Sequence, residues 1–285
     1  MKRTLLSMKQ KKVLGNVGLW ILTILVTFII LFPVFWIFAS SITPVDNLFE
    51  TPVRYFPEQP TLDNYKTLFE TMDVGGMTIT TLIIAGLSIV FTIVVSLFAA
   101  YAFARIKFRG KGLIYSLLVF SAMLPVIVTL IPMSSMMIQL GVNDTPQGLA
   151  FLYTSSFIPF TTMIFTNFIS DVPISLEEAA EVDGAGLFRK MFRILLPLLR
   201  PIIATMAIII FIWSLNEFII PLVFAGNKTV PLSLGLARVP RVSEYSLPWE
   251  KISALATIIL IPIAFFVTAF QKHIMEGLMA GGVKQ

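Results

Sequence analysis

Residues 177 to 201 hold the longest charged stretch between hydrophobic segments, and the order of their charges predicts local structure. The acids come first, where they favour the positive N-terminal end of a helix dipole: Glu177, Glu178 and Glu181. Ser175 can cap that end, with Glu178 three residues on. Gly184 and Gly186 punctuate the helix, and we expect Pro197 and Pro201 to break the chain. The stretch predicts a short helix followed by a bend.

The sequence contains no set of residues that would support catalysis. It has no cysteine, which excludes disulfides and thiolate metal or redox chemistry. His273 is the single histidine, so multi-histidine metal sites are excluded, and we expect no metal site. No glycine-rich loop ends in Lys-Ser or Lys-Thr, so the chain is not expected to bind ATP. We therefore predict that the chain is not an enzyme.

The composition is that of a polytopic membrane protein. Apolar residues make up 56 % of the chain and charged residues 13 %, whereas a soluble domain carries about 25 % charge. The net charge of +5 could indicate nucleic acid. The bases lie beside hydrophobic segments, however, so membrane topology explains them better and no nucleic-acid partner is expected.

Six segments are long and apolar enough to span a bilayer, which takes about 20 residues each. We place them at about 18–41, 78–104, 113–137, 147–169, 201–224 and 252–271. The loop 171–200 separates the fourth from the fifth. Basic residues at 1–17 and at 105–111 indicate that these segments are cytoplasmic, which also places the tail 272–285 in the cytoplasm. The basic loop between the last two spans weakens this argument, but the two stronger clusters outweigh it.

The charged stretch also resembles a known family. Glu178-Ala179-Ala180, then Asp183-Gly184-Ala185, then Ile194-Leu195-Leu196-Pro197 looks like the EAA loop of permease subunits of bacterial ABC importers. In that family the loop forms a cytoplasmic coupling helix that docks on a separate ATP-hydrolysing subunit. The alternative is an amphipathic helix that lies on the membrane surface.

The resemblance extends along nearly the whole chain, to the carbohydrate-uptake branch and the subunit typified by the second maltose permease. The segments that carry it share position and spacing with that branch: 60–65, 99–105, 108–111, 123–125, 131–132, 213–222 and 276–284. One departure is that Ser214 and Leu215 stand between Trp213 and Asn216, where relatives often have Trp immediately before Asn.

The resemblance implies an all-α membrane protein with six transmembrane helices and the type I permease fold of ABC importers. It implies a bacterial cytoplasmic-membrane location and no cofactor on this chain, with ATP and Mg on two partner ATPase subunits. The other partners would be a homologous second permease, an extracytoplasmic sugar-binding protein, the sugar and the lipid bilayer. The docking residues would be Glu178, Ala179, Ala180, Asp183, Gly184 and Ala185, and the tail residues that contact the ATPases would be Glu276, Gly277, Gly281 and Gly282.

Polar and aromatic residues in the spans are candidates for lining the pore or binding the sugar. Asn216 and Glu217 lie near the end of the fifth predicted span, and an intramembrane ionisable residue is a functional candidate by default. They could line a pore or gate, or form a hydrogen-bonded structural pair. Aromatic faces and hydroxyl or amide groups that could bind a sugar belong to Tyr153, Ser155, Ser156, Trp213 and Asn216. An aromatic residue in a span is more often core or interface belt.

The predicted function is translocation of a sugar, with an oligosaccharide favoured. An ABC permease for another solute differs only in its cargo. An ion-coupled secondary transporter would need ionisable groups or broken helices near the midplane, and the predicted spans carry only Glu217. An intramembrane enzyme would need paired catalytic groups at that depth.

Overall fold

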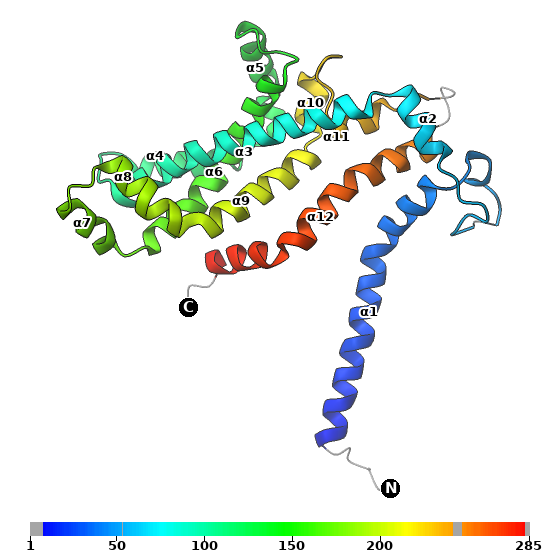
Figure 1. Ribbon diagram of the computed structural model, residues 1–285, viewed down its shortest axis with the longest axis horizontal. Helices are drawn as coiled ribbons and strands as arrows, with labels where there is room; N and C mark the ends of the chain where they lie inside the picture. Colours follow the sequence, from blue (N-terminus) through cyan, green and yellow to red (C-terminus); the bar gives the residue numbers. More distant parts are fainter. Residues whose placement is uncertain (1–7, 53, 242–246, 283–285) are drawn as a thin grey trace. The chain divides into compact units, whose positions relative to one another are not determined.

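The computed structural model describes residues 8–52, 54–241 and 247–282 (Figure 1), with side chains described between residues 16 and 271 outside the same gaps. Within these residues every regular element is a helix, so the expected all-helical fold is confirmed. The chain divides into two compact units, Met1–Met72 with Val239–Ile258, and Asp73–Arg238 with Ile259–Gln285.

The first unit contains α1 (Met8–Ser41), the 3₁₀ turn η1 (Val45–Asn47), α2 (Asp63–Thr71) and the start of α12 (Trp249–Gly282). Most large apolar side chains of α1 between Val17 and Phe38 are exposed, as expected of a helix that faces lipid. The end of α1 is held by α2, because the Asn64 amide donates to the carbonyls of Ser41 at 2.9 Å and Thr43 at 2.8 Å.

The second unit contains the remaining elements: α3 (Val74–Arg105), α4 (Lys111–Ser121), α5 (Val126–Gln139), α6 (Pro146–Asp171), α7 (Ile174–Val182), α8 (Leu187–Lys190), the π-helical turn η2 (Met191–Leu195), α9 (Leu196–Asn216), α10 (Ile219–Phe224), α11 (Leu232–Gly235), the 3₁₀ turn η3 (Leu236–Arg238) and α12 from Ile259 onward. Several ends carry side-chain caps. Asp73 accepts from the Gly76 amide at the start of α3, and Thr145 accepts from the Gly148 amide at the start of α6.

The packing of α3 against α6 is the most extensive helix contact of the second unit. Small side chains on α3 let the helices approach closely, and two serines donate across the contact. Ser88 Oγ lies 3.4 Å from the Ala150 carbonyl, and Ser96 Oγ lies 3.4 Å from the Ile158 carbonyl. The sequence offset is the same in both pairs, so α3 and α6 run in the same direction.

The segment expected as one helix over 113–137 is instead two helices, α4 and α5, bent by 100°. Pro125 is the N-cap of α5. It has no N–H to continue the hydrogen bonds of α4, and its ring disfavours helical backbone at Leu124. Because α3 and α6 run in the same direction, the chain must return between them. The bent pair α4–α5 therefore carries the chain back once, from the end of α3 to the start of α6.

The structure from Leu187 to Phe224 corrects two expectations about where the chain breaks. The chain is helical from Leu187 to Asn216, so Pro197 and Pro201 do not break it. Pro197 stands at the start of α9, directly after the π-turn, where the Leu196 amide reaches the Met191 carbonyl. The wider turn accommodates the missing amide. A break occurs instead at Glu217, inside the segment expected over 201–224, where an extended residue separates α9 from α10.

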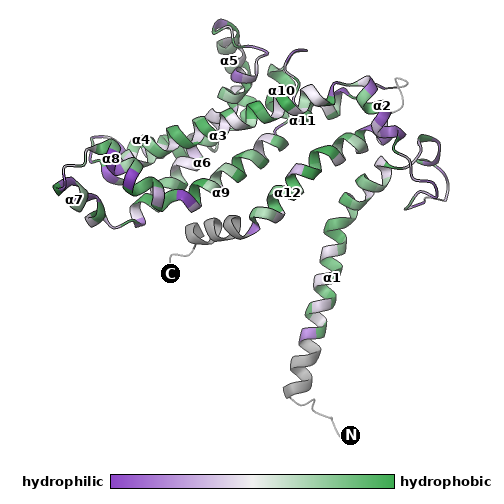
Figure 2. Ribbon diagram, in the orientation of Figure 1, coloured by the Kyte–Doolittle hydropathy of each residue, from purple (hydrophilic) through white to green (hydrophobic). Residues whose placement is uncertain are grey.

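Among the described residues, five helices are long and apolar enough to cross a membrane: Asn16–Ser41, Val74–Arg105, Pro146–Asp171, Leu187–Asn216 and Trp249–Gln271. The bent α4–α5 pair makes a sixth if it is counted as one span. Figure 2 shows hydrophobic residues along these helices and hydrophilic residues gathered at α7 and α8. The chain is thus a multi-span helical membrane protein.

Candidate functional site

The predicted charged helix is α7, and its two ends are built differently from the expectation. Ser175 does not cap it, because the helix begins one residue earlier, at Ile174 after Pro173. The other end turns at Gly184, whose φ of +77° lies in the left-handed region that disfavours side chains with a Cβ. The Gly184 amide donates to the Glu181 carbonyl at 2.9 Å, which closes the helix end. Glycine is therefore required here by backbone geometry.

The residues predicted to dock on a partner do not all face outward. Glu178, Ala179, Asp183 and Gly184 are exposed, and Ala180 is half-buried. Ala185 is only 8 % exposed and packs into the chain, so its side chain is not available at this surface. The sequence reasoning missed Val182, which is 89 % exposed at the end of α7. An apolar residue in a charged stretch was the signal that could have found it.

A buried ion pair joins α7 to the end of α3. Arg105 Nε donates to Glu177 Oε1 at 2.6 Å, and the two side chains are 11 % and 5 % exposed. The same guanidinium donates to the Val172 carbonyl at 2.6 Å, just before α7. Arg105 therefore holds both the start of α7 and the residue that leads into it. The Glu181–Lys190 pair, at 2.9 Å, joins α7 to α8 at a more exposed position.

The polar residues at the end of α9 make hydrogen bonds within the chain. Glu217 Oε1 accepts from the Ile220 amide at 3.0 Å and so caps α10. The Glu217 carbonyl accepts from Ser233 Oγ at 2.7 Å and from the Tyr153 hydroxyl at 3.4 Å. Asn216 is exposed, and its amide donates to the Ile212 carbonyl of its own helix. These contacts favour the structural interpretation of Glu217 over the gate.

Tyr153 and Trp213 are packed among aromatic rings. Tyr153 is 1 % exposed, which leaves no face open to a ligand. Trp213 is 38 % exposed, and its ring centroid lies 5.2 Å from that of Phe157 and 5.3 Å from that of Phe160. The structure does not bring these residues to the same cavity as Ser155 and Ser156.

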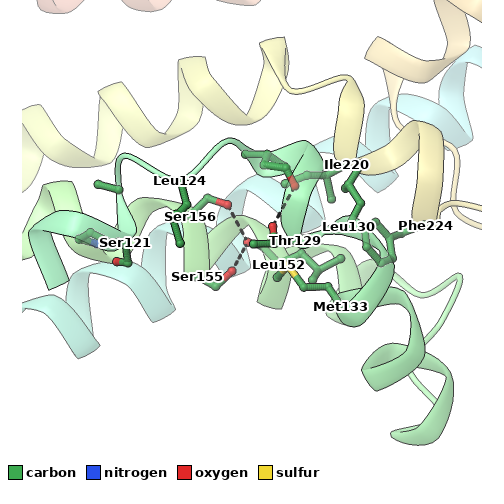
Figure 3. A pocket seen from close by; sticks show the side chains of 13 residues that line it. Ser121, Leu124, Thr129, Leu130, Met133, Leu152, Ser155, Ser156, Ile220 and Phe224 are labelled. Carbon is green, nitrogen blue, oxygen red and sulfur yellow. Dashed lines mark hydrogen bonds between the residues drawn. The ribbon is translucent and has the colours of Figure 1, made fainter. Parts of the chain in front are cut away.

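Ser155 and Ser156 line a cavity of about 220 Å³ at the break between α4 and α5 (Figure 3). Ser121 and Thr129 add hydroxyls from either side of that break, and Pro159 and Phe224 contribute from α6 and α10. None of its 13 lining residues is charged. The cavity thus gathers four hydroxyls from three helices. Two of these hydroxyls, those of Ser155 and Ser156, were predicted from the sequence as candidates for binding a sugar.

A second polar centre, missed by the sequence reasoning, lies at Asp144 in the turn before α6. Its carboxylate accepts from the amides of Gly226 at 2.8 Å, Thr229 at 3.0 Å and Lys228 at 3.2 Å. Asp144 has a φ of +52°, which is uncommon for a residue other than glycine. Its carbonyl accepts from Thr229 Oγ1 at 2.8 Å. This aspartate fastens the loop after α10 to the α5–α6 turn.

The predicted tail residues lie in the last part of α12. Its backbone is helical to Gly282, so Glu276, Gly277, Gly281 and Gly282 are on a helix, and their side chains lie outside the described residues. In the described part of the chain, no three His, Asp or Glu side chains gather as a metal site.

The helices and the α7 surface define a class: a multi-span helical membrane protein with a surface helix set between its spans. Residues 92–278 match the model of the family described as "Binding-protein-dependent transport system inner membrane component". The chain belongs to that family. It is 32 % identical to the sulfoquinovosyl glycerol transport system permease protein SmoH of Agrobacterium fabrum, over 89 % of each chain.

A second relative supports the assignment, and a solved structure shares the fold. The chain is 31 % identical to the trehalose/maltose transport system permease protein MalG of Thermococcus litoralis, over 96 % of this chain and 99 % of that one. Its fold matches a chain of a bacterial ABC transporter involved in the import of the acidic polysaccharide alginate, with a TM-score of 0.80 and 21 % identity over 94 % of this chain and 99 % of the other.

Membership settles the general role. The chain is a multi-pass inner-membrane permease subunit of a binding-protein-dependent ABC importer. It is not itself catalytic, because in this family ATP is bound and hydrolysed by separate subunits. The resemblance noted in the sequence to ABC permeases is confirmed.

Proposed function

We propose that this chain translocates a sugar, and specifically an oligosaccharide, that an extracytoplasmic binding protein delivers. The observation that carries the proposal is the similarity, over nearly the whole chain, to permeases named for trehalose, maltose and sulfoquinovosyl glycerol. All three solutes contain a sugar unit. The uncharged, hydroxyl-lined cavity between α4, α5 and α6 is compatible with such a cargo.

The second part of the proposal is that α7 docks in a cleft of an ATPase subunit. Its contact surface consists of Glu178, Ala179, Ala180, Asp183 and Gly184, with Val182 at its centre. The two alanines are small enough for a groove to close on them, and the two carboxylates can accept charge-assisted hydrogen bonds. Ala185 supports the turn from inside instead of touching the partner.

The third part concerns assembly and orientation. This chain pairs with a homologous second permease, and two ATP-binding subunits lie below the pair on the cytoplasmic side. Both termini are cytoplasmic, because the bases cluster at the N-terminus and between α3 and α4. The end of α12, with Glu276, Gly277, Gly281 and Gly282, then lies on the ATPase side and contacts those subunits.

The contacts suggest how the motion of the ATPases reaches the spans. ATP binding draws the two ATPase subunits together and moves α7 with them. Because Arg105 holds Glu177 and Val172, the end of α3 must follow α7. The extensive packing of α3 on α6 then carries the motion to the wall of the cavity. ATP hydrolysis resets the arrangement.

The test is a transport assay with the full importer in proteoliposomes, supplied with its binding protein and ATP. We expect uptake of radiolabelled oligosaccharide from a panel that includes trehalose, maltose and raffinose, and no uptake without ATP. ATP-dependent uptake of only a non-sugar solute would leave the permease family intact and overturn the sugar assignment. Uptake that depends on an ion gradient and does not require ATP would contradict the ABC mechanism.

A further inference from the structure

The four hydroxyls that line the cavity at the α4–α5 break are already engaged as hydrogen-bond donors. The four hydroxyls each give their proton to a carbonyl of their own helix: Ser121 to Leu118 at 2.7 Å, Thr129 to Val126 at 2.8 Å, Ser155 to Leu152 at 2.7 Å and Ser156 to Leu152 at 3.3 Å. A hydroxyl has one proton and two lone pairs. With the protons committed, these side chains offer only acceptors to a ligand.

The backbone around the cavity adds to this bias. Pro159 lines the cavity, and it has no N–H to donate to the carbonyl of Ser155 one turn earlier. Pro125, at the break between α4 and α5, also lacks an N–H. Irregular backbone at membrane depth is tolerated where it lines a cavity. Pro159 therefore leaves the Ser155 carbonyl without its helical donor, which adds one acceptor to the place where the hydroxyl acceptors gather.

The rest of the lining is apolar and carries no charge. Leu130, Met133, Leu152 and Ile220 form its apolar wall, and the Phe224 ring lies at the end opposite Ser121 (Figure 3). No Lys, Arg or His belongs to the lining, so no basic side chain there can neutralise a carboxylate or a sulfonate. Burying an unpaired anion is much more costly than burying a hydroxyl that finds an acceptor.

We propose that this cavity is a subsite for an uncharged sugar unit, which donates its hydroxyl protons to Ser121, Thr129, Ser155 and Ser156 and rests its apolar face on Phe224. The inference rests on the proposed function and sharpens it in two respects. This subunit itself contacts the cargo, and the unit that it contacts is neutral. An acidic sugar would find no partner for its charge in this cavity.

The absence of cysteine from the chain makes a direct test possible, since an introduced cysteine is the only thiol on this subunit. Ser156→Cys places a thiol at the cavity with little change in size, and the probe is a small uncharged thiol reagent. The matched control is Ser135→Cys, on exposed α5 outside the lining. Both variants are assembled with the complete importer, any accessible cysteines of the partner subunits are first replaced, and uptake is measured on the same preparation.

We expect a transported neutral sugar, chosen from trehalose, maltose and raffinose, to slow labelling of Ser156→Cys by about tenfold and to leave Ser135→Cys unchanged. An alginate oligosaccharide at the same concentration should protect neither. In addition, Thr129→Val should weaken the protection at Ser156→Cys by about three- to tenfold, as expected for the loss of one neutral hydrogen bond.

Three outcomes would overturn the inference. If the preparation transports a neutral sugar and Ser156→Cys is labelled equally fast with and without it, the sugar path lies elsewhere, while the proposed function stands. If Ser156→Cys is protected in every condition, a lipid or partner side chain fills the cavity. If the alginate oligosaccharide protects it, the subsite is not restricted to neutral units. Failure of all sugars to be taken up would instead overturn the proposed function.

Discussion

Arg105 and Glu177 are 72 residues apart in sequence, and their side chains meet at 2.6 Å in a buried ion pair. The pair joins the end of a spanning helix, α3, to the first turn of the surface helix α7. Arg105 also holds the Val172 carbonyl, so α7 cannot tilt without breaking or moving this contact. Breaking one partner of a buried pair costs about 3–5 kcal/mol, which makes the joint firm.

The first prediction tests that joint. Glu177→Gln keeps the shape of the side chain and leaves the Arg105 charge unpaired. We expect the importer to assemble and to hydrolyse ATP, while the amount of sugar taken up per ATP hydrolysed falls by about tenfold because α3 no longer follows α7 faithfully. The measurement is paired uptake and phosphate release in proteoliposomes.

The control for the first prediction is Glu181→Gln, one turn further along the same helix. Glu181 pairs with Lys190 at an exposed position, with 68 % of the glutamate side chain accessible, and such pairs contribute little. We expect this variant to behave like the wild type. Equal coupling in the two variants would show that the Arg105–Glu177 pair does not transmit motion.

The second prediction concerns the Asp144 centre. Asp144→Ala removes the acceptor of three backbone amides, so the loop 225–229 should detach from the α5–α6 turn. Lys228 is exposed, and we expect its cleavage by trypsin to become about tenfold faster, since hydrogen bonds to a charged group contribute about 1.5–3 kcal/mol. Gly226→Ala should have the same effect, because a Cβ there would clash with Asp144 Oδ2.

Asp46→Ala is the control for that experiment, because it removes a carboxylate from a different turn, η1. Trypsin cleavage after Lys228 should be unchanged in it. If Asp144→Ala also left cleavage unchanged, the loop would be held by other contacts, such as that of Arg238 with the Gly226 carbonyl.

The third prediction separates structure from specificity at Glu217. Glu217→Ala removes the cap of α10, and losing a helix cap costs about 1 kcal/mol. We expect the melting temperature of the purified importer to fall by a few degrees, while the order in which competing sugars inhibit uptake stays the same. A changed order of competition would restore Glu217 as a pore-lining residue.

Hydrophobic runs alone were sufficient to predict an all-helical membrane fold. They could not locate the breaks at Pro125 and Glu217, nor show that Pro197 and Pro201 leave the chain helical, because each outcome depends on a single residue and its surroundings. Pro125 starts a new helix at an angle of 100° to α4, whereas Pro197 follows the π-turn η2 and Pro201 lies inside the continuous helix α9. The residue type is the same, and the outcome depends on the backbone hydrogen bonds available on either side.

The candidate sites, like the fold, could be predicted from the sequence only in part. The pattern Glu178-Ala179-Ala180 with Asp183-Gly184 located the α7 surface, because glycine at a left-handed turn leaves a local signature. The partner of Glu177 could not be found in this way, since Arg105 is brought to it by the packing of α3 on α6. Asp144 could not be found from local sequence either, because its three amide donors lie more than 80 residues away.

The fourth prediction addresses the end of α12. Deleting the residues after Glu276 removes the glycine-containing end that we propose to contact the ATPases. We expect the shortened subunit to reach the membrane at the wild-type level, because its spanning helices are intact, and to support several-fold less uptake. Membrane level is measured by immunoblot and uptake in the same vesicles. Unchanged uptake would identify this segment as a frayed terminus.

The docking of α7 on an ATPase subunit is the central claim, and Gly184 offers its most direct test. Gly184→Val puts a β-branched side chain at a φ of +77°, at a cost of about 1–3 kcal/mol, and forces the end of α7 to rearrange. Gly186→Ala is the matched control, because its φ of −70° suits any residue and no atom lies within 4 Å of the added Cβ. The measurement is copurification of the ATPase subunit with the tagged permease, at equal membrane levels. The account predicts at least a tenfold loss of ATPase in Gly184→Val and none in Gly186→Ala. Full recovery of the ATPase with Gly184→Val, accompanied by wild-type uptake, would show that α7 is only a surface helix.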